Sequence, residues 1–346
     1  MKAKSKMEVS PIEEQISSPL VIQEDIEEAV VLDNLDSDNH PNFIESNTSA
    51  ISVEELTEKC IVPTFADNTL TIAHQSFIES VVEAGSEVFG KLTPVECRVS
   101  HQVNGRIPTA LHKKPSELTD EEKTQYYQRL AFVCHVESLV RTINGQPVHL
   151  CLGGVRSYSE DKLYTRQSPM KFKIFVGWQV RVCSNLCLTC SGFTGNIECM
   201  TPADIKEKAL ELFQGFDPEK EENLKSLEAL GNTTLTEEQF CKVMGRLRLY
   251  QYLSPKTKSE LNLPNIILGD QACNAAVRGY VENPNFKKEE GVDTTTLWQF
   301  LQLLNEAVKA TYIDKWLERN QNCTDLTFGL QRAIEGSDSQ YEWFLS

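Results

Sequence analysis

The sequence predicts an α+β protein with a mainly antiparallel sheet in its first half, a helical C-terminal half and a disordered acidic N-terminal tail. Runs of strand-type alternation come first and runs of helical spacing follow, whereas an alternating parallel fold would mix the two. The 346 residues are 40% apolar and 24% charged, which is ordinary globular composition. Residues 1–60 carry a net charge of −10 and only isolated pairs of apolar residues, too few to offset the entropy of ordering.

These patterns divide the chain into three parts: a tail (1–55), a β-rich basic region with one or two helices (56–200), and a helical region packed on the sheet (201–346). We expect the last two to form one continuous domain. No apolar run approaches a membrane span, and no apolar segment follows the basic residues at the N-terminus. We therefore expect a cytoplasmic protein whose eleven cysteines are mostly reduced core thiols.

Local signals place the elements of the β-rich region in order. The apolar spacing of 74–89 predicts a helix that ends at Gly90, with His74 as a surface or capping residue. A strand is expected over 96–103. The capping-box pattern Thr119–Glu122 predicts a short helix through Tyr127. Asn144-Gly145 tolerates positive φ values and predicts a hairpin between two β-rich runs.

The longest β-type stretch is 171–188. Its alternation places Phe172 and the following even-numbered apolar residues on one face and Lys171, Lys173 and Arg181 on the other, so we expect a basic outer face. Upstream, Gly153-Gly154 before Arg156 lacks the Lys-Ser/Thr pair of a P-loop, and the glycines predict a bulge or tight bend.

Helical spacing and caps dominate the C-terminal half. Thr201-Pro202 predicts a helix to about 214, and Thr236 with Gln239 predicts another over 240–253. Further helices are expected over 270–280, 295–310 and 312–319.

Four cysteines lie close together in the sequence. Cys183, Cys187 and Cys190 have the spacing by which some enzymes hold a [4Fe–4S] cluster, and Cys199 could add a thiolate. The position past the middle of the chain and the absence of a repeated βα pattern favour core thiols. We therefore predict no cofactor and no metal site. The patterns Gly-x-Ser-x-Gly, His-Glu-x-x-His and Gly-x-Gly-x-x-Gly are absent, and we favour a non-enzymatic role.

Several stretches together resemble a known family. RVSHQVNGRIP, EKTQYYQRLAF, GGVRSYSEDKLY, FKIFVGWQVRVCSNLC, NIILGDQ, TTTLWQFLQLLNEAVKATYIDKWLERN and WFLS are similar to an uncharacterised bacterial domain-of-unknown-function family of Bacteroidota mobile elements, related to the phage/plasmid-like protein family. The resemblance spans 60–346. It includes Cys183, Asn185, Leu186 and Cys187 but neither Cys190 nor Cys199, and it implies a bacterial protein carried by phage, plasmid or conjugative DNA.

Residues 91–190 carry a net charge of +6 in an otherwise acidic chain. Basic residues interleaved with aromatics are typical of surfaces that bind single-stranded nucleic acid. The candidate contacts are Arg98, Arg106, Arg156, Tyr158, Lys162, Tyr164, Arg166, Lys171, Lys173 and Arg181. Three alternatives stay open: a sheet face of solvated lysines without function, a module that binds a host or mobile-element protein through the tail or the helical half, and a thiolate metal or Fe–S enzyme.

Overall fold

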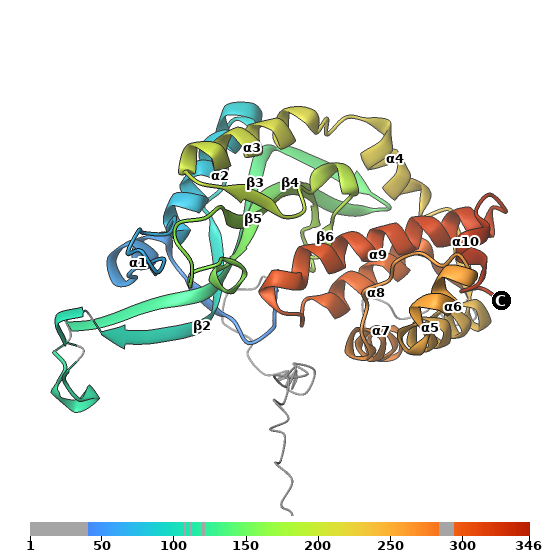
Figure 1. The fold of residues 1–346 in the computed structure, drawn as a ribbon. Helices are drawn as coiled ribbons and strands as arrows, with labels where there is room; N and C mark the ends of the chain where they lie inside the picture. The colour runs from blue at the N-terminus through green and yellow to red at the C-terminus, as the bar shows by residue number, and fades with distance from the viewer. Residues whose placement is uncertain (1–40, 107, 111, 120–121, 284–293) are drawn as a thin grey trace, which may run out of the picture.

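A computed structural model describes residues 41–106, 108–110, 112–119, 122–283 and 294–346. Within these residues the first half of the chain forms a seven-stranded antiparallel sheet and the second half is mostly helical (Figure 1). The α+β prediction is confirmed. The sheet order is β1 (Ser49–Ile51), β2 (Glu96–Arg106), β3 (Lys123–Ile143), β4 (Gln146–Ser157), β5 (Met170–Val180) and β6 (Leu186–Cys187), and β7 (Ile197–Cys199) also pairs with β5.

The predicted hairpin is confirmed. β3 ends at Ile143 and β4 begins at Gln146, and the two turn residues have φ values of +47° at Asn144 and +78° at Gly145.

The predicted helix after Thr119 is wrong. The Glu122 carboxylate does accept a hydrogen bond from the Thr119 amide, as in a capping box. However, the β-branched and aromatic residues that follow favour a strand, and Lys123 pairs with Arg106 of β2.

Helices cover both faces of the sheet. α2 (His74–Phe89) and α3 (Pro202–Gly215) pack on one face, where Phe77 and Phe172 are buried. α9 (Ile313–Ile334) packs on the other face, where Trp316 contacts Phe175. β5 therefore alternates as predicted, but both of its faces are buried. It ends at Val180 rather than running to 188, because a turn with a positive φ at Ser184 intervenes before β6.

The helical half contains, among the described residues, α4 (Glu221–Ala229), α5 (Glu237–Tyr252), α6 (Pro255–Glu260), α7 (Asp270–Glu282), α8 (Leu297–Val308), α9 and α10 (Ser339–Glu342), with a two-stranded sheet of β8 (Thr234–Thr236) and β9 (Thr294–Thr296). The capped helices after Thr201 and Thr236 are confirmed. α9 is far longer than the predicted 312–319. Its Thr324 and Thr327 donate hydrogen bonds to carbonyls one turn earlier, so these polar residues lie buried inside the helix.

The predicted tail extends too far. Residues 1–40 lie outside the described residues, but the segment after them belongs to the fold: Phe43 and Ile44 are buried, and the Phe43 ring lies 5.2 Å from Trp316. Ser49–Ile51 forms β1, and Ser52 caps α1 (Val53–Lys59). No helix among the described residues combines the length and apolar character needed to cross a membrane.

Candidate functional site

Three of the ten candidate nucleic-acid contacts lie in the interior and cannot reach a ligand at the surface. Arg156 is 1% exposed, Tyr158 3% and Lys173 2%. The Arg156 guanidinium lies between the rings of Tyr158 and Phe172, at 4.3 and 4.6 Å from their centroids. It pairs with Asp161 at 3.2 Å and donates a hydrogen bond to the Ile72 carbonyl. The assignment of these three residues to a nucleic-acid surface is therefore wrong.

The carboxylate that holds Arg156 is itself buried and further hydrogen bonded. Asp161 accepts a hydrogen bond of 2.9 Å from the Lys171 amide. Burial raises the pKa of Asp161, while the charge of Arg156 and these hydrogen bonds act in the opposite direction. Asp161 follows Arg156 by only five residues, and this acidic neighbour was the signal in the sequence that the arginine is paired.

His74 completes this buried group and is neither exposed nor a cap. Its Nε2 donates to the Tyr127 carbonyl at 2.8 Å, and its Nδ1 is buried with no hydrogen-bond partner among the described residues. Burial, and then the charge of Arg156, lowers the pKa of His74 to about 3. The ring is therefore neutral at physiological pH, and it packs at a tilt against Tyr158, with the ring centroids 4.4 Å apart.

Gly153 and Gly154 lie within β4 rather than at the predicted bulge. A Cβ atom on Gly153 would lie 2.0 Å from the Phe132 carbonyl oxygen, and one on Gly154 would lie 2.5 Å from the Phe77 ring. Close packing therefore accounts for both glycines. The register shift in this part of the sheet lies instead between His135 and Val140 of β3.

α9 neutralises the outer face that the alternation of β5 predicted to be basic. The Lys173 ammonium lies 3.2 Å from Glu318 and 3.4 Å from Glu160, and donates to the Asp314 carbonyl at 2.6 Å. Arg129 of β3 pairs with the Asp314 carboxylate at 3.0 Å. The prediction of a basic outer face is therefore wrong, because a helix more than a hundred residues away in sequence covers it.

Other candidate contacts lie together on a surface loop. Lys162, Tyr164 and Arg166 are exposed, and the Tyr164 side chain is 83% accessible. Two contacts fix this loop on 60–70: the Ala66 amide donates to the Thr165 carbonyl at 2.9 Å, and the Gln167 amide donates to the Asp67 carboxylate at 3.0 Å. The loop is therefore attached to the segment 60–70 and presents its exposed tyrosine between two cations.

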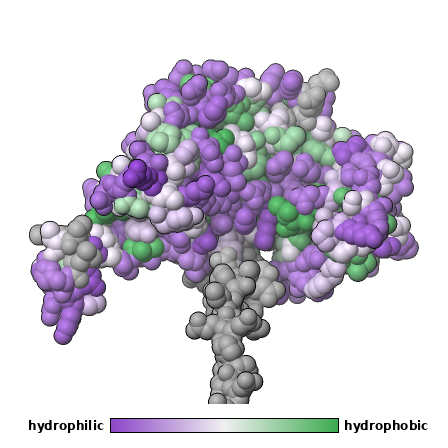
Figure 2. Space-filling view, viewed as in Figure 1, coloured by the Kyte–Doolittle hydropathy of each residue, from purple (hydrophilic) through white to green (hydrophobic). Residues whose placement is uncertain are grey.

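The segment 60–70 also contacts a projecting two-stranded arm. β2 and the first part of β3 extend away from the body (Figure 1), and the surface at the end of this arm is mostly hydrophilic (Figure 2). The Ile61 amide donates to the Gln125 carbonyl of β3 at 2.8 Å. Residues 97–106 and 123–131 contain no carboxylate and four basic residues, Arg98, Arg106, Lys123 and Arg129. We call this arm and the loop 162–166 the arm surface.

The remaining candidates are divided between the arm surface and other places. Arg106 lies on the arm and donates a hydrogen bond to the Lys113 carbonyl. Arg98 lies eight residues before Arg106 on β2, opposite Ala131 of β3. Lys171 is half-buried and stands opposite Glu198 in the register of β5 and β7. Arg181, exposed, follows the opposite end of β5, roughly 33 Å along the strand from Lys171. The structure thus gathers only part of the predicted set.

The four clustered cysteines are not brought to one point. Cys187 is opposite Trp178 and Cys199 is opposite Met170, which separates them by eight residues of β5, or roughly 26 Å. Burial raises the pKa of Cys187 to about 12, and Gln302 donates a hydrogen bond to its sulfur. Cys190 is exposed near α9. These four residues therefore do not form the thiolate site that their spacing suggested.

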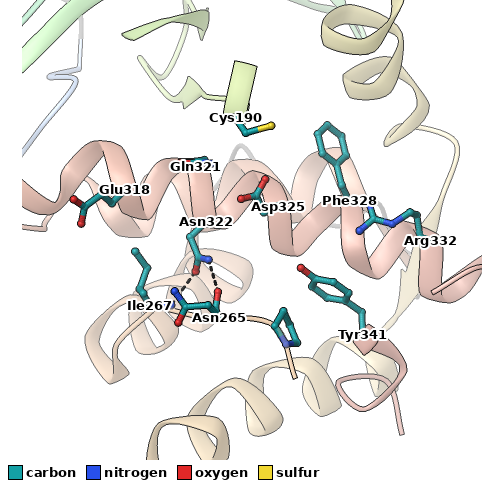
Figure 3. A pocket seen from close by; sticks show the side chains of 11 residues that line it. Cys190, Asn265, Ile267, Glu318, Gln321, Asn322, Asp325, Phe328, Arg332 and Tyr341 are labelled. Atoms are coloured by element: carbon teal, nitrogen blue, oxygen red, sulfur yellow. Dashed lines mark hydrogen bonds between the residues drawn. The ribbon is translucent and has the colours of Figure 1, made fainter. Parts of the chain in front are cut away.

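A pocket of about 680 Å³ lies in the helical half of the chain (Figure 3). It is lined by residues of α9, α10 and the segment 264–267, together with Cys190. Asp325, Phe328 and Tyr341 present a carboxylate and two rings to it. Neither the pocket nor its lining was predicted, because its walls come from segments that carry no recognisable motif.

Comparison with known proteins gives one match. Residues 25–345 match the family described as "Domain of unknown function, B. Theta Gene description (DUF3871)". No curated protein and no solved structure matches the chain.

Proposed function

Because the chain belongs to the DUF3871 family, whose description assigns no activity, we propose a function from its surface: the arm surface binds nucleic acid, preferentially single-stranded. The carrying observation is the loop 162–166, where the exposed Tyr164 stands between two exposed cations, beside a ribbon whose outer end carries Arg106 and Lys123. A strand of nucleic acid needs such a track for its phosphates and an exposed ring on which a base can stack. In the proposal, Tyr164 supplies the ring, and Lys162 and Arg166 contact the flanking phosphates.

The proposed setting is an accessory, non-enzymatic role in a bacterial phage, plasmid or conjugative element. The support for this setting is the similarity of the quoted stretches to the phage/plasmid-like protein family. A cytoplasmic location is part of the same proposal. It is supported by the eleven cysteines, which all lie in described parts of the chain and are all free thiols.

Fluorescence anisotropy with labelled single strands and duplexes tests the proposal. We expect the full chain to bind single strands more tightly than duplexes, with affinity falling steeply between ~50 and ~200 mM salt. Replacing Lys162 and Arg166 with Gln removes two phosphate contacts and should reduce the salt slope by about 1.4, at about 0.7 per contact. Tyr164→Ala should weaken binding by ~1–3 kcal/mol through lost stacking.

The matched control is Lys256→Gln on α6, where the side chain is 85% exposed and distant from the arm in the fold. This variant should bind as the unmodified chain does. Absence of binding at ~50 mM salt, or binding with no salt dependence, contradicts the proposal.

A second candidate function is the binding of a host or element protein by the helical half. The observation that favours it is a set of exposed apolar side chains on α5 and α7, with Tyr252 76%, Val277 40% and Val281 68% accessible. Val277 and Val281 are one turn apart and share a face of α7. Affinity capture with the chain and with Val281→Lys tests this: the captured protein should disappear with the variant, and an unchanged capture profile counts against this face.

A further inference from the structure

The pocket between α9 and α10 has fixed walls. Asn322 of α9 donates to the Asn265 carbonyl at 2.8 Å and accepts from the Ile267 amide at 2.9 Å, so one side chain attaches the segment 264–267 to the helix (Figure 3). On the opposite side, the Tyr341 ring packs directly on Gly329, where a Cβ atom would lie 2.3 Å away. The lining is therefore held in place by contacts on both sides.

Two of the charged groups around the pocket are already neutralised. Arg332 pairs with Asp338 at 3.0 Å and lies 5.8 Å from the Tyr341 ring centroid. Glu318 pairs with the buried Lys173 at 3.2 Å. Neither group offers an uncompensated charge to a ligand.

Asp325 is different from these neighbours. Its carboxylate points into the pocket and makes no hydrogen bond or ion pair with any residue that the structure describes (Figure 3). The side chain is half-buried, and burial raises its pKa although Arg332 opposes the shift. Tyr341 lines the same pocket, and burial, followed by the charge of Asp325, raises the pKa of its hydroxyl. The pocket thus contains one partly desolvated carboxylate without a direct ion-pair partner among the described residues, because the guanidinium of Arg332 pairs with Asp338 instead.

We propose that this pocket binds a small aliphatic amine, whose ammonium group pairs with Asp325 and donates to the Tyr341 hydroxyl while its methylenes lie against Phe328. An ammonium donates up to three hydrogen bonds, which suits a carboxylate beside a hydroxyl. A divalent metal ion would need several oxygen ligands at once, whereas one carboxylate here lacks a partner. The volume of about 680 Å³ accommodates a ligand of this class.

Titration calorimetry with putrescine and spermidine as probes tests the proposal. The full chain should bind at least one of the two, and 1,4-butanediol, which matches putrescine in length but has no charge, should not bind. Asp325→Asn preserves shape and removes the charge, and it should weaken amine binding at least ten-fold. Tyr341→Phe keeps the ring on Gly329 and should weaken binding by a smaller factor.

The matched control is Glu335→Gln, an exposed carboxylate on the turn that ends α9 and outside the pocket lining. It should bind the amine as the unmodified chain does. Absence of binding by both amines, equal binding of the diol, or an undiminished affinity in Asp325→Asn overturns the proposal. Thermal unfolding of each variant shows whether a loss of amine binding results from misfolding. If Asp325→Asn does not fold, the amine affinity of Tyr341→Phe decides whether the proposal stands.

Discussion

Asp161→Asn should destabilise the protein strongly, because it removes the only charge that faces Arg156 at hydrogen-bond distance among the described residues. Both side chains of this pair are fully buried. The substitution keeps the size of the side chain and leaves a buried guanidinium cation without its anion. Breaking a buried pair in this way costs about 3–5 kcal/mol. That is a large fraction of the ~5–15 kcal/mol by which a domain is usually stable.

Thermal unfolding followed by circular dichroism measures this loss. At about 2–4 °C per kcal/mol for a chain of this size, the midpoint should fall by roughly 10 °C. Asp67→Asn is the matched control, because Asp67 accepts similar backbone hydrogen bonds from an exposed position, and its effect should be much smaller. A midpoint that falls by less than about 2 °C in Asp161→Asn would refute the reasoning.

Two further predictions concern the same part of the sheet. Because the pKa of His74 is lowered from 6.5 to about 3, its contribution to stability is present above pH 6.5 and is lost as the pH falls below it. The free energy of unfolding measured in urea should therefore fall by about 2 kcal/mol between pH 7 and 5. An equal fall in His74→Gln would count against this explanation. Gly153→Ala should lower the unfolding midpoint by several degrees, since its Cβ would meet the Phe132 carbonyl; an unchanged midpoint would show that β4 has room there.

The elements that the sequence predicted well are those whose signals lie within one segment. α2 has the predicted bounds because its apolar spacing and the terminating Gly90, with a φ of +84°, are local. The Asn144-Gly145 turn and the Thr201 and Thr236 caps are equally local. Two features predicted from local signals are absent: the bulge at Gly153-Gly154, which lie within β4, and the helix after Thr119, where pairing with β2 extends β3 instead.

What the sequence did not reveal depends on contacts between distant segments. The alternation of β5 separates Phe172 from Lys173 correctly, but it contains no information about α9, which supplies the carboxylates that neutralise Lys173. The partner of Arg129 likewise comes from α9, nearly two hundred residues later. The candidate surface therefore shrinks to the outer part of the arm, around Arg106 and Lys123, and the loop around Tyr164, because α9 pairs with Arg129.

Photocrosslinking maps the proposed nucleic-acid surface most directly. A single-stranded oligonucleotide with a photoreactive base, irradiated in complex with the full chain and analysed by mass spectrometry, should form adducts on the loop 162–166, Tyr164 above all, and on the exposed strands of the arm. Adducts confined to the helical half, or none at a concentration that saturates the anisotropy signal, would contradict the assignment of nucleic-acid binding to the arm surface.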